Sequence, residues 1–192
     1  RDGAVIWQDN AGFADVANQI AVADDTMFML ASVSKTVTAV AMMALIEDGA
    51  ASLDEPVDAY LPFTVRNPRF PDTPITFRML LTHTSSINDA AAVYDNYYTQ
   101  GDSPIPLETF LAGYFTPGSD YYDPDNFLNA APGEKYRYSN EGTALLGLLV
   151  QRISGQSFED FCATRIFLPL GMNDTAWRLA ALDASRVALP YA

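Results

Sequence analysis

Ala31-Ser32-Val33-Ser34-Lys35 is the stretch of sequence on which the prediction of the fold depends. It stands between short strand-like segments and a long apolar segment that stops at Gly49, which predicts a helix over residues 32–48. Three residues are most of one helical turn, so the Ser32 hydroxyl and the Lys35 amine should project from the same face. Because desolvation disfavours a charged amine, a lysine at the entry of such an apolar helix is suited to moving protons.

A second polar group stands at Tyr138-Ser139-Asn140, where a loop meets another apolar helix, predicted from about residue 140 to 154. A phenol has an unperturbed pKa near ~10, so Tyr138 needs a neighbouring cation to act as a base near neutral pH. Asn140 offers an amide that can orient a substrate carbonyl or contact Lys35, although an asparagine at a helix start is commonly just a cap. The two segments therefore form one site only if folding brings Tyr138 to Lys35.

Several segments of the chain together resemble the class C serine β-lactamases, the D-alanyl-D-alanine carboxypeptidases and the related serine esterases. They are, in the family's order, residues 31–35, 80–85, 132–140, 146–147 and 167–172. Ser-x-x-Lys is a signature of acyl-enzyme chemistry, and Tyr-x-Asn in place of Ser-Asp-Asn points to the class C side. The resemblance covers nearly the whole chain.

The resemblance implies acyl transfer to the Ser32 hydroxyl from an amide, β-lactam or ester carbonyl of a small-molecule or peptide substrate. Ser32 would be the nucleophile, with its backbone N–H as one donor of an oxyanion hole. Lys35 and Tyr138 would share the proton transfer, and Asn140 would bind the substrate. Which of Lys35 and Tyr138 is the base stays open, because closely coupled groups titrate as a pair. No cofactor is implied.

The fold that the resemblance implies is α+β, of the β-lactamase and transpeptidase type, with an antiparallel sheet plus a helical lobe. Residues 1–50 should hold the sheet strands and the nucleophile helix, residues 51–176 a mainly helical lobe with an irregular region at 89–131, and residues 177–192 the start of the C-terminal part. Strands are expected at residues 4–7, 12–16 and 27–30.

A third motif of the family, Lys-Thr-Gly or His-x-Gly on a strand near the C-terminus, has no match after Tyr138. The chain is therefore expected to be partial, with its C-terminal strands missing. A sheet without them would expose unpaired backbone and apolar surface. A second chain or a symmetry-related copy is among the ways to complete such a fold.

The composition excludes several classes of function. Eleven basic against 24 acidic residues give a net charge of −13, which repels nucleic acids and anionic lipids. No apolar stretch approaches the ~18 residues that span a bilayer. One histidine and one cysteine make no metal-ligand cluster, so no metal is predicted. A periplasmic or secreted location in bacteria is implied by the resemblance alone.

Two side chains and one region have plain structural interpretations. His83 is the only histidine, and no Gly-x-Ser-x-Gly elbow exists, so His83 is predicted to be structural and not a general base. Cys162 lies among apolar residues at helical spacing, which predicts a buried, inert thiol. The tyrosines of residues 89–131 either wall a ligand cleft or pack an irregular lobe against the body, and both interpretations stay open.

A hydrolase is not the only function that these motifs allow. A noncatalytic sensor or binding module, or an inactive fragment, could keep the Ser32 pocket and lack turnover. The unmatched third motif favours that alternative. The joint presence of Ser32, Lys35, Tyr138 and Asn140 favours the hydrolase, because a pocket freed from catalysis need not keep all four groups.

Overall fold

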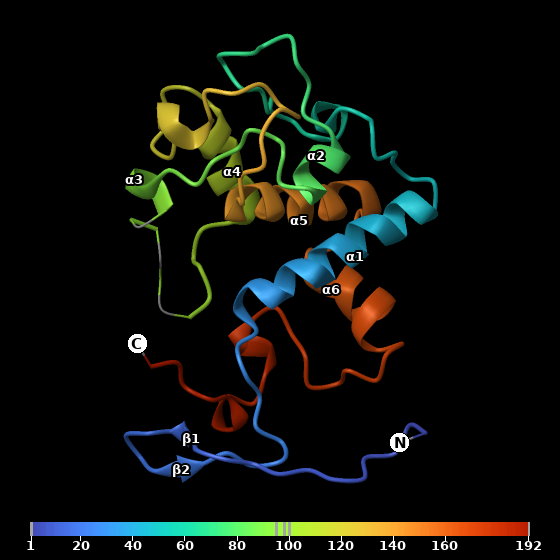
Figure 1. Ribbon diagram of the computed structural model, residues 1–192, viewed down its shortest axis with the longest axis vertical. Coiled ribbons are helices and arrows are strands. Elements are labelled where there is room, and N and C mark those ends of the chain that lie inside the picture. Colours follow the sequence, from blue (N-terminus) through green and yellow to red (C-terminus); the bar gives the residue numbers. More distant parts are fainter. Residues whose placement is uncertain (1, 95, 98, 100, 192) are drawn as a thin grey trace.

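The computed structural model describes residues 2–94, 96–97, 99 and 101–191. A buried helix, α5 (Asn140–Ser154), lies at the centre of its helical part (Figure 1). The elements that contact α5 in the described part of the chain include four α-helices. They are α1 (Ser34–Glu47), α2 (Phe77–Leu81), α4 (Leu107–Phe115) and α6 (Phe158–Cys162). Most of the α5 surface is buried because its leucines and glycines face neighbours on several sides, which makes α5 the element that positions the others.

The ends of α5 lie where the sequence predicts them. At the start, the Ser139 hydroxyl oxygen accepts a hydrogen bond from the N–H of Gly142 at 2.9 Å. At the end, Gly155 takes a left-handed φ of 70°, a conformation that glycine adopts without steric cost. The predicted helix from residue 140 to 154 is confirmed.

The segment after α5 begins with a reciprocal cap. The Ser157 hydroxyl accepts from the N–H of Asp160 at 3.0 Å and donates to its carboxylate at 2.7 Å. Helix α6 continues into one wider turn, Ala163–Phe167. Cys162 is fully buried there, which confirms the predicted burial, and burial raises the pKa of its thiol to about 11, as suits an inert thiol.

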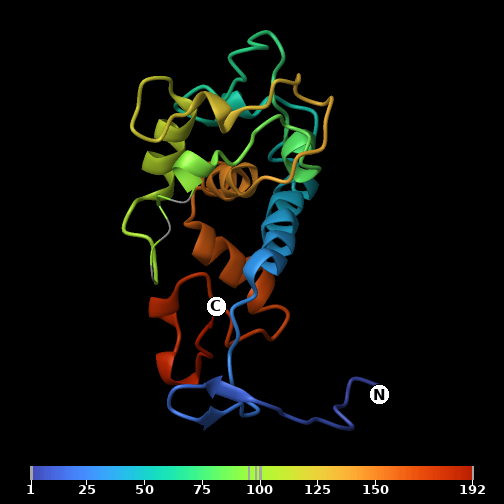
Figure 2. The same ribbon diagram turned by 60° about the vertical axis from the view of Figure 1, so that its left-hand side comes forward.

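Helix α1 follows a short 3₁₀ turn, Ala31–Val33, and only one of its faces is buried. Thr38, Ala41, Met42 and Leu45 are the buried residues, whereas Val40 and Met43 on the other side are exposed. An apolar helix is commonly buried on all sides, but among the described residues α1 is buried on one face only. The β-ribbon of the structure lies beyond the N-terminal end of α1 and covers neither side of it (Figure 2).

The described sheet is one antiparallel ribbon of β1 (Phe13–Asp15) and β2 (Ile20–Ala21), with Phe13 opposite Ala21. β1 falls within the strand expected at residues 12–16, whereas β2 lies outside the three expected strands. Residues 4–7 form no strand, and of residues 27–30 only Met27 makes a bridge, with Val187. These two expectations are wrong, because strand propensity forms a strand only where a partner backbone is available.

The polypeptide after α6 returns to this ribbon. The N–H of Leu189 donates to the carbonyl of Ala14 at 2.8 Å, and the Tyr191 hydroxyl donates to the Asp15 carboxylate at 2.8 Å. Arg186 forms an ion pair with Asp174 at 2.9 Å. The end of the described chain is therefore tied to its beginning.

The irregular region at 89–131 contains α3 (Ala91–Tyr94), α4 and a short turn, Pro124–Asn126. Tyr114 is fully buried, and its hydroxyl donates to the carbonyl of Asn88 at 2.5 Å. The buried amide of Asn126 donates to the carbonyls of Tyr114 and Tyr121. Packing therefore explains part of this tyrosine-rich region, while Tyr98 lies outside the described residues. The remaining short turns are Val57–Tyr60, Leu179–Ala181 and Ala184–Arg186.

If α5 is the central element of the core, removing one of its buried side chains should lower the stability of the fold. Leu149 has no exposed surface, so Leu149→Ala should lower the free energy of unfolding by about 3 kcal/mol through lost burial and an unfilled cavity. Leu168→Ala is the matched control, since that leucine is 61% exposed and should change stability by less than about 0.5 kcal/mol. Urea denaturation followed by circular dichroism measures both, and equal losses would contradict the central place of α5.

Candidate active site

Ser32 and Lys35 lie one turn apart at the entry of α1, as the sequence spacing predicts. Lys35 Nζ donates to Ser32 Oγ at 3.2 Å. Ser32 is exposed and Lys35 is half-buried. Ala31, just before Ser32, takes a φ of 47°, a left-handed conformation that costs a non-glycine residue of the order of 1 kcal/mol. The chain therefore turns sharply at the point where it presents the serine hydroxyl.

Tyr138 and Asn140 reach the same serine and lysine from the start of α5. The Tyr138 hydroxyl donates to Ser32 Oγ at 2.7 Å. Lys35 Nζ donates to Asn140 Oδ1 at 2.6 Å and lies 4.8 Å from the centre of the Tyr138 ring. The structure thus brings together all four residues that the sequence singled out.

The positive charge of Lys35 changes the proton affinity of the phenol. Interaction with Lys35 first, and the hydrogen bond with Ser32 second, hold the pKa of Tyr138 below its usual value near 10. The Tyr138 side chain is 40% exposed, so solvent also reaches this pair. A hydroxyl, an amine and a phenol in mutual contact can pass a proton among themselves, which is what activating a serine requires.

Asp89 is a member of the site that the sequence reasoning missed. Its carboxylate accepts hydrogen bonds from the Asn140 side-chain amide at 2.9 Å, the Asn140 N–H at 2.7 Å, the Glu141 N–H at 3.2 Å and the Ser139 hydroxyl at 2.7 Å. Because the Asn140 amide nitrogen faces Asp89, its oxygen is turned to Lys35. No local spacing connects Asp89 with Asn140, which lies 51 residues further along.

His83 supports the site from behind. Its Nδ1 accepts the N–H of Ser139 at 3.3 Å, and its ring lies 4.8 Å from that of Tyr138. Burial first, and the charge of Lys35 second, lower the pKa of His83, so the neutral ring that accepts this hydrogen bond is favoured. These contacts agree with the structural role predicted for His83.

A crevice of about 440 Å³ opens beside the phenol. Asp89, Tyr136, Arg137 and Tyr138 line it. Within the described part of the chain, no three histidine, cysteine, aspartate or glutamate side chains are grouped so that they could hold a metal ion. A helix with the length and apolar character needed to cross a membrane is likewise not found among the described residues.

Known proteins are similar to this chain in fold and in sequence. The beta-lactamase family model matches residues 1–192. Penicillin-binding protein 4* of Bacillus subtilis is 32% identical, over 96% of this chain and 38% of its own length. The octameric penicillin-binding protein homologue from Pyrococcus abyssi superposes with a TM-score of 0.80 at 30% identity, over 100% of this chain and 42% of that chain. EstCE1, a hydrolase with promiscuous acyltransferase activity, gives 0.77 at 26% identity, over 100% of this chain and 49% of that chain.

The fold, with a serine, a lysine and a tyrosine in contact, is of the class of serine hydrolases that includes penicillin-binding proteins and esterases. The chain belongs to the beta-lactamase family. The expected α+β fold of the β-lactamase and transpeptidase type is confirmed, and the chain spans less than half the length of these three relatives.

The contacts of Asp89 predict that it positions Asn140. Asp89→Asn replaces a carboxylate that accepts four hydrogen bonds by an amide with fewer acceptor sites, so the reaction of Ser32 with an activated ester should slow by about tenfold or more. Asp120→Asn, an exposed aspartate, is the control and should leave the rate unchanged. Stopped-flow release of p-nitrophenol measures the rate, and an unaltered rate in Asp89→Asn would refute the positioning role.

Proposed function

We propose that this chain carries the nucleophile part of a serine hydrolase that works through an acyl-enzyme on Ser32. The observation that supports the proposal most directly is the double contact of Ser32 Oγ, which accepts from the Tyr138 hydroxyl at 2.7 Å and from Lys35 Nζ at 3.2 Å. A serine hydroxyl is a weak nucleophile until a neighbouring group takes its proton. Both candidate groups are already within hydrogen-bonding distance.

In the proposed reaction, Ser32 Oγ bonds to the substrate carbonyl carbon while its proton passes to the pair formed by Lys35 and Tyr138. The tetrahedral intermediate then collapses, and the leaving nitrogen or oxygen takes that proton as its bond to the carbonyl carbon breaks. Water attacks the resulting ester in the same way and restores the free serine. The lowered pKa of Tyr138 favours its share in accepting the proton, but the two groups act as one coupled system.

Asn140 is proposed to bind the substrate with its amide group. Its orientation is fixed from two sides, by Lys35 on the oxygen and by Asp89 on the nitrogen. The backbone N–H of Ser32 is the proposed first donor of an oxyanion hole, where one donor is worth about 3 kcal/mol in the transition state. The second donor and the group that binds a substrate carboxylate are proposed to belong to the third motif of the family, outside these 192 residues.

The substrate class is proposed as a β-lactam, a peptide-like amide or a simple ester. The relatives named above include a penicillin-binding protein and a hydrolase with promiscuous acyltransferase activity, which supports acyl transfer without selecting among these three carbonyl types. A location outside the bacterial cytoplasm is part of this proposal.

A second candidate is a penicillin-binding sensor that is acylated but turns over slowly. The sequence feature that favours it is the unmatched Lys-Thr-Gly or His-x-Gly motif. The rate at which the acyl group leaves Ser32 separates the two candidates. A sensor keeps its adduct for hours, whereas a hydrolase hydrolyses the acyl-enzyme in every turnover.

Acylation should depend on Ser32 alone among the neighbouring serines. Intact-protein mass spectrometry after exposure to a penicillin, and separately to a p-nitrophenyl ester, should show an adduct with at least one reagent. Ser32→Ala should abolish the adduct, whereas Ser34→Ala, two residues away, should keep it. An adduct that persists in Ser32→Ala, or none with either reagent in the unaltered chain, would refute the proposal.

Removal of the phenol should slow acylation without loss of the fold. Tyr138→Phe deletes the hydroxyl that contacts Ser32 Oγ, and the loss of a proton-transferring group should lower the acylation rate about 10²-fold or more. Tyr122→Phe is the control, since Tyr122 does not line the crevice and no hydrogen bond of its hydroxyl is found among the described residues. Equal rates for the two variants at pH 7 would exclude Tyr138 from the proton transfer.

A further inference from the structure

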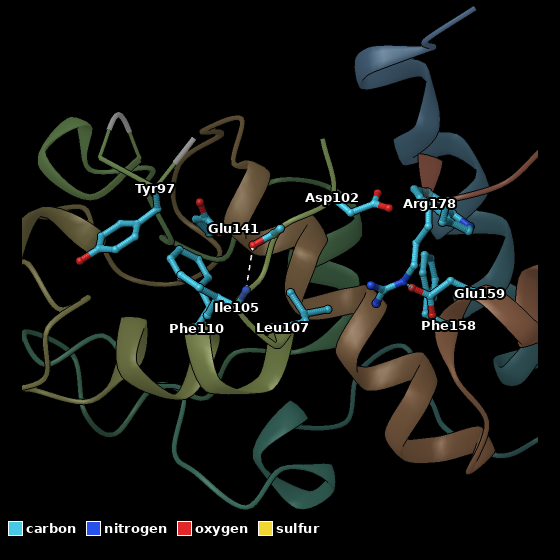
Figure 3. Close-up of a pocket in the computed structure, with 11 residues that line it drawn as sticks. Tyr97, Asp102, Ile105, Leu107, Phe110, Glu141, Phe158, Glu159 and Arg178 are labelled. Carbon is cyan, nitrogen blue, oxygen red and sulfur yellow. Dashed lines mark hydrogen bonds and ion pairs between the residues drawn. The ribbon is translucent and has the colours of Figure 1, made fainter. Parts of the chain in front are cut away.

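A second cavity, of about 390 Å³, lies beside the first turn of α5, and Ser32, Lys35, Tyr138 and Asn140 are not among the residues that line it. It is bounded by α4, by the start of α6 and by two segments near residues 102–105 and 177–178. Figure 3 shows Glu141 at one end, near Tyr97 and Phe110, and the pair of Glu159 and Arg178 at the other. The cavity therefore has a buried acid at one end and a charged rim at the other.

Glu141 is an unusual residue to find buried in this position. It is 7% exposed, and no hydrogen bond or ion pair to its carboxyl group is found among the described residues. Its backbone N–H donates to Asp89, which fixes the main chain. The Glu141 side chain lines the cavity, so a carboxyl group this deeply buried is positioned to take a partner from within it.

The other acids of the cavity already have partners. The Asp102 carboxylate accepts the N–H groups of Leu179 at 3.1 Å and Ala180 at 3.2 Å. Glu159 is paired with Arg178 at 2.8 Å. Three acids against one base leave the lining negative, and among the described contacts Glu141 is the acid whose carboxyl group has no partner.

The walls of the cavity are aromatic. The rings of Phe158 and Trp177 lie 4.8 Å apart, and those of Tyr97 and Phe110 lie 6.1 Å apart. Aromatic faces attract cations and also bury apolar groups, and a cavity of this volume is in the range that takes a small organic molecule. Negative charge and aromatic walls together select an organic cation.

We propose that this cavity binds a small organic cation, a primary ammonium on an aryl or short alkyl body, with the ammonium on the Glu141 carboxylate and the body against Phe110, Phe158 and Trp177. This proposal does not rest on the hydrolase function proposed above.

The protonation of Glu141 gives the binding a pH dependence. Burial first, and the charge of Asp89 second, raise the pKa of Glu141 to about 7, while Lys35 acts in the opposite direction. The charged or titratable groups around it are Lys35, Asp89, Tyr97, Asp102, Tyr114, Glu159 and Arg178. Because the ammonium pairs with the ionised carboxylate, affinity should rise as the pH passes upward through 7.

Trp177 provides the measurement. The chain has two tryptophans, and Trp7 is 77% exposed and outside the cavity, so Trp7→Phe leaves Trp177 as the single tryptophan, which is excited selectively at 295 nm or above. Titration with phenethylammonium chloride at pH 8.5 should change the fluorescence with a Kd on the order of 1 mM, as suits a fragment-sized ligand. Phenethyl alcohol, which has the same body without the charge, should bind at least about tenfold more weakly. The ammonium should also bind at least about tenfold more weakly at pH 5.5, where Glu141 is protonated.

Glu141→Gln should weaken phenethylammonium binding by at least about tenfold, and the matched control Asp72→Asn, which removes one exposed charge outside the cavity, should not. The folded-state pKa of Glu141 lies above the unfolded value of 4.5, so its ionisation destabilises the fold as the pH rises through 7. Glu141→Gln should therefore have a higher Tm than the parent at pH 8.5 and an equal one at pH 4, which verifies its folding.

Equal binding of the alcohol and the ammonium would overturn the proposal. So would unchanged affinity in Glu141→Gln, the same affinity at pH 5.5 and 8.5, or no saturable change up to about 20 mM ligand. The pH comparison uses the unaltered Glu141 and therefore tests the proposal even if the glutamine variant does not fold. No acylating reagent is present, so a failure here leaves the chemistry at Ser32 untouched.

Discussion

Lys35 Nζ lies 2.6 Å from Asn140 Oδ1, and this contact joins the first turns of two helices that the chain makes far apart in its sequence. The helices α1 and α5 pack through apolar side chains, and that packing sets the distance between their polar starts. Close-packed interiors resist small displacements, so the four polar side chains are held in place by a core that has no part in the chemistry. The geometry of the site is thus a product of the hydrophobic contact beneath it.

Charges alternate along a line that passes through the site. The Lys35 cation faces the oxygen of Asn140, the nitrogen of Asn140 faces the Asp89 anion, and the phenol of Tyr138 lies beside the cation. Each group orients the next, and the Asn140 amide transmits this order because its two ends have opposite polarity. Glu141 is next in sequence, and the charges of Asp89 and Lys35 both act on the pKa of its carboxyl group. The second cavity is therefore connected electrostatically to the first.

Local chemistry made some of these features predictable from the sequence. The helix boundaries at α5, the cap at Ser157 and the contact of Ser32 with Lys35 depend on residues three or four positions apart, where helical geometry is decisive. The meeting of Tyr138 with Ser32 depends on tertiary structure, and it was expected from the family resemblance and not from spacing. Asp89 and the cavity at Glu141 have no local signal at all. The strands expected at residues 4–7 and 27–30 failed because a strand needs a partner, which a propensity does not provide.

The left-handed backbone at Ala31 limits which amino acids this position can accept. A side chain branched at Cβ would clash with its own carbonyl group at a φ of 47°. Glycine would adopt this φ without steric cost but would make the turn more flexible. Alanine is a compromise between steric tolerance and rigidity. The backbone itself therefore restricts which side chains can replace Ala31, one residue before the serine.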